Sequence, residues 1–232
     1  MPDELISITT PDGDLPAHLW RPSSGTGPGI LLQQEIFGVS DYVARRGQDL
    51  ADLGYVVLAP ELYWRRDASR VENGPEALEQ ALALVQRLDW ASAVEDGVAA
   101  LEALGKLPGA SGGAGIVGFC FGGGLGFNVA AVADPDVLVS YYGSALPSLL
   151  ALAPEVTAPS LHHFGLADSY IDAATVAQVE QAVAGRPDVT FATYPGADHA
   201  FDNDDFMFFD AEASARAWQG TVEFLAERLP TG

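Results

Sequence analysis

One cysteine lies in a segment whose residue types suit nucleophilic chemistry. Cys120 is the middle residue of segment 118–122, GFCFG, which follows a short apolar run and opens a predicted helix. A sharp turn from a strand into a helix crowds the neighbours of its central residue, so both flanking positions favour glycine. The turn also places the sulfur near a helix N-terminus, where the helix dipole favours a thiolate. The segment therefore predicts a nucleophile elbow at Cys120, with a buried structural cysteine as the alternative.

Two residues further along the chain could serve Cys120 as a base and an orienting acid. In folds built around such an elbow, the chain order is nucleophile, acid, histidine. Asp168 follows one predicted strand, and His199 lies in the loop after the last one. Asp172 is the alternative acid, but it directly precedes a predicted helix, where an aspartate suits an N-cap better. Cys120, Asp168 and His199 therefore have the order and the strand-end placement of a catalytic triad.

The other groups that could bind a metal ion form no adequate ligand set. His162 and His163 lie inside the apolar run 160–164, and adjacent strand residues point to opposite faces of a sheet. A single cysteine excludes an internal disulfide and a multi-thiolate zinc site. The acidic segment 202–205 lacks the glycine-containing pattern of a calcium loop. We therefore expect no metal ion and no cofactor.

Apolar runs and alternating patterns predict strands that alternate, after the first two, with helical patterns. The strands are predicted at 5–9, 15–20, 29–33, 55–59, 115–117, 137–141, 160–164 and 189–193. The helices are predicted at 42–53, 75–88, 91–104, 122–133, 173–184 and 210–228. Alternation at this spacing predicts an α/β protein, in which a mostly parallel central sheet is covered by helices on both faces.

The segment 10–14, TPDGD, has the composition of a turn, so the first two strands are predicted to pair as an N-terminal antiparallel hairpin. Segments 23–27 and 109–115 resemble surface turns, and they are too short to separate domains. We therefore expect residues 1–232 to form a single α/β domain.

The charge and composition of the chain exclude several classes of protein. It has 232 residues, of which 11 are basic and 32 acidic, giving a formal net charge of −21. Nucleic-acid phosphates and anionic membrane surfaces would repel such a chain. With 48% hydrophobic and 19% charged residues, it is not typical of intrinsic disorder. No signal-peptide pattern and no apolar stretch long enough for a membrane span is visible, so a soluble, cytoplasmic protein is expected.

The chain resembles the dienelactone hydrolase family, a branch of the α/β hydrolases with a cysteine nucleophile. The resemblance covers nearly the whole chain and is carried by the elbow 118–122, Asp168 and the segments 34–38 (QEIFG), 59–63 (APELY), 141–143 (YYG) and 199–201 (HAF). It implies an α/β-hydrolase fold and the hydrolysis of an ester or lactone. It also implies that Cys120 is the nucleophile, that His199 is the general base and then the acid, and that Asp168 orients His199.

Glu35 follows the strand predicted at 29–33, at the sheet edge where open α/β sheets bind ligands. A carboxylate beside a thiol opposes thiolate formation and can accept the thiol's hydrogen bond, which keeps the resting thiol neutral. The resemblance implies that substrate binding shifts this carboxylate and releases the thiolate; a surface glutamate in a loop is the alternative. The backbone N–H groups of Phe121 and Ile36 are the expected oxyanion hole.

Four further residues are expected to contact the substrate: Tyr141, Arg65, Arg66 and Phe37. Tyr141 and Tyr142 end a predicted strand, and one of the two could face the substrate, with core packing as the alternative. Arg65 and Arg66 follow the segment 59–63, and the alternative for them is a solvated loop. Phe37 belongs to the segment that contains Glu35.

The expected function is hydrolysis of a small-molecule ester or lactone by a Cys-His-Asp triad through an acyl-cysteine intermediate. The alternatives are a hydrolase-like protein that binds a ligand without turnover, and a redox-sensing thiol. Asp202, Asp204 and Asp205 lie near His199 in the sequence and would repel a carboxylate substrate unless they point away. An uncharged ester or lactone is therefore considered beside dienelactone. We expect a monomer or homodimer with no nucleic-acid or membrane partner.

Overall fold

The predicted strands all join one sheet in the computed structural model, which describes residues 4–66, 68–72 and 74–232. Within these residues the sheet has eight strands in the order β1-β2-β4-β3-β5-β6-β7-β8. The strands are β1 (Glu4–Thr10), β2 (Gly13–Trp20), β3 (Gly27–Gln33), β4 (Val56–Pro60), β5 (Ala110–Phe119), β6 (Val137–Tyr141), β7 (Ser160–Gly165) and β8 (Val189–Tyr194). The α-helices are α1 (Asp41–Asp52), α2 (Ala77–Gln86), α3 (Trp90–Lys106), α4 (Phe121–Ala133), α5 (Ala173–Val183) and α6 (Ala211–Arg228).

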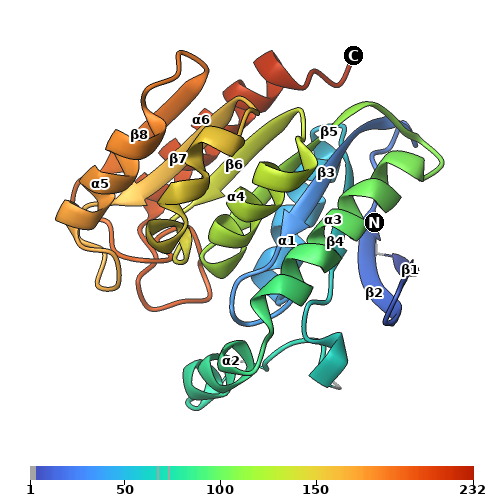
Figure 1. Cartoon of the computed structure of the whole chain (residues 1–232), viewed down its shortest axis with the longest axis horizontal. Coiled ribbons are helices and arrows are strands. Elements are labelled where there is room, and N and C mark those ends of the chain that lie inside the picture. Colours follow the sequence, from blue (N-terminus) through green and yellow to red (C-terminus); the bar gives the residue numbers. More distant parts are fainter. Residues whose placement is uncertain (1–3, 67, 73) are drawn as a thin grey trace.

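The strand directions confirm the predicted fold class. The hairpin β1–β2 is antiparallel and turns between Thr10 and Gly13, and β2 also pairs with β4 in the antiparallel sense. All remaining neighbours, from β4 through β3 to β8, are parallel. Helices α3 and α4 cover one face of the sheet, whereas α1 and α6 cover the other (Figure 1). Helix α2 lies apart from both layers (Figure 1).

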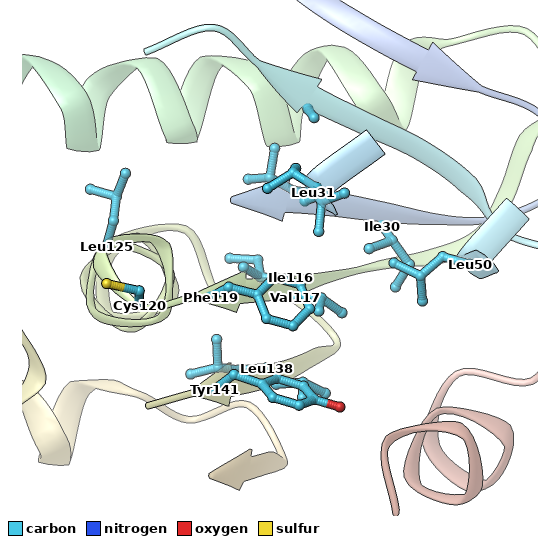
Figure 2. Close-up of a cluster of buried hydrophobic side chains, with 14 of the residues drawn as sticks. Ile30, Leu31, Leu50, Ile116, Val117, Phe119, Cys120, Leu125, Leu138 and Tyr141 are labelled. Atoms are coloured by element: carbon cyan, nitrogen blue, oxygen red, sulfur yellow. The ribbon is translucent and has the colours of Figure 1, made fainter. Parts of the chain in front are cut away.

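The central strands are buried because helices cover both sides of the sheet. Every residue of β3, β4, β6 and β7 is buried, as expected for strands of a two-sided parallel sheet. Figure 2 shows buried side chains of three adjacent strands, with Ile116 and Leu138 on the α4 face of the sheet, Ile30 on the opposite face and Cys120 at the start of α4. In the described part of the chain, no helix is long and apolar enough to cross a membrane.

The prediction that 109–115 is a surface turn is wrong. Ala110 to Gly115 belong to β5, and this part of the strand pairs with β3. The register with β3 shifts between Gly27 and Gly29, and Gly112 and Gly113 both have positive φ angles. The glycines therefore form an irregularity inside the strand instead of ending it.

Candidate active site

Cys120 stands where the chain turns sharply from β5 into α4. Its φ of 54° and ψ of −116° lie in a region that non-glycine residues rarely adopt. A Cβ atom on Gly118 would lie 2.2 Å from the carbonyl oxygen of Gly122, and one on Gly122 would lie 2.4 Å from that of Gln33. Both distances are too short for carbon and oxygen, so this turn needs glycine at both flanking positions.

Three strand ends bring Cys120, His199 and Asp168 into contact. The Nε2 atom of His199 lies 3.1 Å from the sulfur of Cys120, and Nδ1 lies 2.8 Å from Oδ2 of Asp168. The other Asp168 oxygen accepts hydrogen bonds of 2.8 Å from the backbone N–H groups of Tyr170 and Ile171. These bonds hold the carboxylate in place, and Asp168 in turn fixes the orientation of the His199 ring. The alternative acid, Asp172, caps α5 through the N–H of Thr175.

The electrostatics of the site favour a charged imidazole. Burial by itself would lower the pKa of His199, but the charges and hydrogen bonds of Cys120 and Asp168 outweigh it and raise this pKa to about 10. An imidazolium beside the sulfur stabilises a thiolate on Cys120. The rings of Tyr142 and Tyr170 flank His199, with centroids 5.2 and 5.1 Å from that of the imidazole. The pair is therefore largely shielded from solvent.

Glu35, Cys120 and His199 line one cavity, in which Glu35 is buried. Glu35 does not accept a hydrogen bond from Cys120. Its Oε2 accepts a 2.7 Å bond from Nδ2 of Asn203, and its Oε1 is buried without a hydrogen-bond partner among the described residues. In the described residues, the sulfur of Cys120 contacts His199 and, at 3.9 Å, the hydroxyl of Ser144. The expected hydrogen bond between the thiol and Glu35 is therefore absent here. Burial raises the pKa of Glu35 to about 7, although the bond from Asn203 opposes this shift.

Glu35→Gln is expected to change how stability depends on pH. Because the folded state raises the pKa of Glu35 from 4.5 to about 7, it binds the proton more tightly than the unfolded chain does. The tighter proton binding adds up to about 3 kcal/mol to the free energy of unfolding. This gain is full below about pH 4.5 and is lost as pH rises through about 7. Urea unfolding at pH 5 to 8 should show the variant gaining stability relative to wild type as pH rises. A pH-independent difference, equal to that of the exposed control Glu155→Gln, would contradict this.

The two backbone N–H groups expected to form an oxyanion hole belong to residues that line the cavity. Phe121 is the first residue of α4, so its N–H has no carbonyl four residues earlier in the helix. Ile36 follows Glu35 in the loop after β3 and lies on the same cavity, as does Phe37. A carbonyl oxygen of a ligand in this cavity could therefore approach both loops that carry these N–H groups.

The structure corrects three of the expected substrate contacts, because Tyr141, Arg65 and Arg66 do not line the cavity. Tyr141 is fully buried, and its hydroxyl is hydrogen-bonded to Thr221, on α6 behind the sheet. Arg65 forms ion pairs with Asp96 and Asp12, and Arg66 donates to the backbone carbonyl of Arg87. Intramolecular partners hold all three side chains. Tyr142, one residue on, packs against His199 instead.

Several residues that line the cavity next to Cys120 were not predicted from the sequence. The cavity has a volume of about 200 Å³, and its lining includes, beside the predicted residues, Leu78, Leu82, Val85, Ser144, Tyr170, Ala200 and Phe206. Ser144 directly follows the segment 141–143, at the end of β6, and this position could have predicted that it lines the cavity. The side chains of α2 carried no such signal, because an apolar helix face normally indicates core packing.

The acidic residues that follow His199 point away from the cavity. Asp202 accepts hydrogen bonds of 2.9 and 2.8 Å from the guanidinium of Arg46 and one of 2.7 Å from Ser214. Asp204 and Asp205 both pair with Arg45. These ion pairs therefore reduce the repulsion that the three aspartates would exert on a carboxylate substrate near His199. Within the described residues, no group of three or more His, Cys, Asp or Glu side chains could hold a metal ion.

The described sheet has eight strands and is mostly parallel. Cys120 stands at the turn after β5, Asp168 follows β7, and His199 follows β8. These features define the class of α/β hydrolases. Comparison with known proteins then identifies the family. A sequence profile described as the dienelactone hydrolase family matches residues 15–229. The chain belongs to this family and is a hydrolase.

Relatives and solved structures match almost the whole chain. The chain is 32% identical to "Carboxymethylenebutenolidase 1" of Cupriavidus pinatubonensis, over 95% of each sequence. It is 33% identical to "Carboxymethylenebutenolidase" of Pseudomonas putida, over 96% of each. A candidate dienelactone hydrolase from Klebsiella pneumoniae superposes with a TM-score of 0.83 at 28% identity, covering 97% of this chain and 98% of that one.

Proposed function

We propose that this protein hydrolyses a carboxylic ester or lactone, with Cys120 as nucleophile, His199 as base and acid, and Asp168 as the orienting carboxylate. The observation that carries the proposal is the continuous pair of contacts, 3.1 Å from Cys120 to His199 and 2.8 Å from His199 to Asp168. The relatives named carboxymethylenebutenolidase support an ester or lactone as the bond cleaved.

The acylation step begins with attack of the Cys120 thiolate on the ester carbonyl carbon. The carbonyl π electrons move to oxygen, and the N–H groups of Phe121 and Ile36 stabilise this oxyanion. When the tetrahedral intermediate collapses, the bond to the alcohol oxygen breaks. Nε2–H of His199 donates its proton to that oxygen, which leaves a thioester on Cys120 and a neutral imidazole.

The deacylation step uses water as the second nucleophile. Neutral His199 removes a proton from the water molecule as its oxygen attacks the thioester carbonyl. Collapse of the second intermediate expels the thiolate of Cys120 and releases the carboxylic acid. The thiolate and the imidazolium are then restored as a pair, and Asp168 stabilises the imidazolium throughout.

In this proposal the charge and position of Glu35 control how readily Cys120 forms a thiolate. A charged carboxylate close to the sulfur would disfavour the thiolate, and a neutral carboxyl group would not. The bond from Asn203 ties Glu35 to the loop after His199, so a ligand that displaces this loop also moves the carboxylate. Substrate binding and the charge next to Cys120 are thereby coupled.

The test is to trap the acyl-enzyme. After rapid mixing with p-nitrophenyl acetate and acid quenching, the intact mass should increase by one acetyl group, and peptide mapping should place it on Cys120. Release of p-nitrophenolate should show a burst of about one equivalent per chain, followed by steady turnover. Acetylation without subsequent turnover would instead indicate a reactive thiol in a binding protein. Turnover with no adduct on Cys120 would refute the mechanism.

A further inference from the structure

Helix α2 carries an apolar stripe that faces the cavity instead of the protein core. Leu78, Leu82 and Val85 are spaced by four and three residues, which places them on one face of the helix. All three line the cavity next to Cys120. Leu78 and Leu82 are 36% and 42% exposed, and Ala81 is the one buried residue of α2. A helix normally buries such a stripe against the protein, whereas the two leucines of this stripe remain partly exposed at the cavity.

Two aromatic side chains line the same cavity. Phe37 and Phe206 lie against each other with ring centroids 5.9 Å apart, and both border the cavity of Cys120. A second cavity of about 420 Å³ shares Phe37, Leu78 and Phe206 with the first and reaches Met207, which is 82% exposed. Apolar surface therefore extends from the reactive sulfur to the outside of the molecule.

Among the residues that the structure describes, no lysine or arginine lines either cavity. The charged or titratable side chains of the described lining are Glu35, Cys120, Tyr170 and His199 in the first cavity and Asp205 in the second. The arginines nearby are engaged by the protein's own carboxylates: Arg45 with Asp204 and Asp205, Arg46 with Asp202, Arg65 with Asp96 and Asp12, and Arg70 with Asp41 and Glu72. A carboxylate on the substrate would lose its hydration without gaining an arginine or lysine partner, because the imidazole of His199 is already held by Cys120 and Asp168.

We propose that the cavity selects uncharged esters or lactones, whose apolar group packs between the α2 stripe (Leu78, Leu82 and Val85) and the rings of Phe37 and Phe206. This inference rests on the proposed function and adds the substrate class to it. An apolar group of the substrate would cover the exposed leucines and exclude water from the sulfur.

A matched pair of substrates tests the charge preference. Mono-p-nitrophenyl glutarate and p-nitrophenyl hexanoate differ in the end of the acyl chain, a carboxylate in one and an ethyl group in the other. The wild-type kcat/KM should favour the hexanoate by about tenfold or more. The kcat/KM for the hexanoate should also exceed that for p-nitrophenyl acetate, because the longer chain buries more methylene groups. Equal or greater kcat/KM for the glutarate would overturn the inference.

A charge placed on the stripe should reverse this preference in part. Leu78→Arg puts a cation on the cavity wall, and the hexanoate-to-glutarate ratio of kcat/KM should fall by about tenfold. Val132→Arg is the matched control, because Val132 is 63% exposed on α4 and lines a different cavity. Leu82→Arg repeats the test should Leu78→Arg fail to fold. An equal ratio in the stripe variants and Val132→Arg would overturn the inference.

The variant Cys120→Ala distinguishes failure of the proposed function from failure of the proposed substrate class. If hydrolysis of both esters persists in Cys120→Ala, the catalytic assignment fails, whatever the charge preference. If hydrolysis depends on Cys120 but the glutarate is preferred, the proposed function holds and the substrate class is wrong.

Discussion

Cys120→Ala is expected to lower kcat/KM for an aryl ester by about 10⁴-fold or more, because the proposed covalent intermediate forms on the sulfur that this substitution removes. His199→Ala should lose activity to a similar extent, since the thiol then has neither a base nor an imidazolium partner. The double variant should be no worse than either single variant, because the two residues act as one unit. The measurement is the initial rate of p-nitrophenyl ester hydrolysis, with thermal unfolding of each variant to show that it is folded.

A second histidine provides the matched control. His18 lies on β2, where its Nε2 is 2.9 Å from Oε1 of Glu61, and it does not line the cavity. His18→Gln should therefore retain wild-type kcat/KM. Cys120→Ala or His199→Ala with more than about one tenth of wild-type activity would contradict the assigned roles.

Asp202→Ala is expected to cost about 3 kcal/mol or more of folding stability. The carboxylate of Asp202 is buried between Arg46, Tyr42 and Ser214, and it accepts hydrogen bonds from all three. Its removal leaves the mostly buried guanidinium of Arg46 without its bidentate partner and takes away the carboxylate acceptor of the Tyr42 and Ser214 hydroxyls. Equilibrium unfolding in urea measures the loss.

The same loop contains the control for this prediction. Asp204 is about half exposed and pairs with Arg45, which is also exposed. Asp204→Ala should therefore cost less than about 1 kcal/mol. If the two substitutions have equal and small effects, the buried ion pair does not contribute as we expect.

The parts of this protein that were predictable from sequence are those with local signals. The strands with buried runs, the alternation with helices and the elbow at Cys120 each follow from residues close together in the chain. Asp168 and His199 were found because both lie just after strands, and parallel strands bring their carboxyl ends to one edge of the sheet. Distance in the chain did not matter for these residues, because the topology places them together.

The errors concern side chains whose partners are distant in the sequence. Arg65 is held by Asp96 and Asp12, which are 31 and 53 residues away, and no local pattern indicates that pairing. Tyr141 and Tyr142 are adjacent, and the choice between them depends on the backbone after β6. Tyr142 has a φ of 36°, so the chain bends there and brings this ring to His199.

The elbow at Cys120 and helix α2 differ in how well they tolerate substitution. The elbow is wedged into the sheet, where a single added carbon on Gly118 or Gly122 would collide with the backbone. Helix α2 contributes one fully buried side chain, Ala81, and lines the cavity with Leu78, Leu82 and Val85. Substitutions at the two glycines of the elbow are thus costly to folding, whereas conservative substitutions at the exposed residues of α2 cost less. A lineage of such proteins, or a directed-evolution library confined to residues 77–86, can acquire new substrates while the catalytic core stays the same.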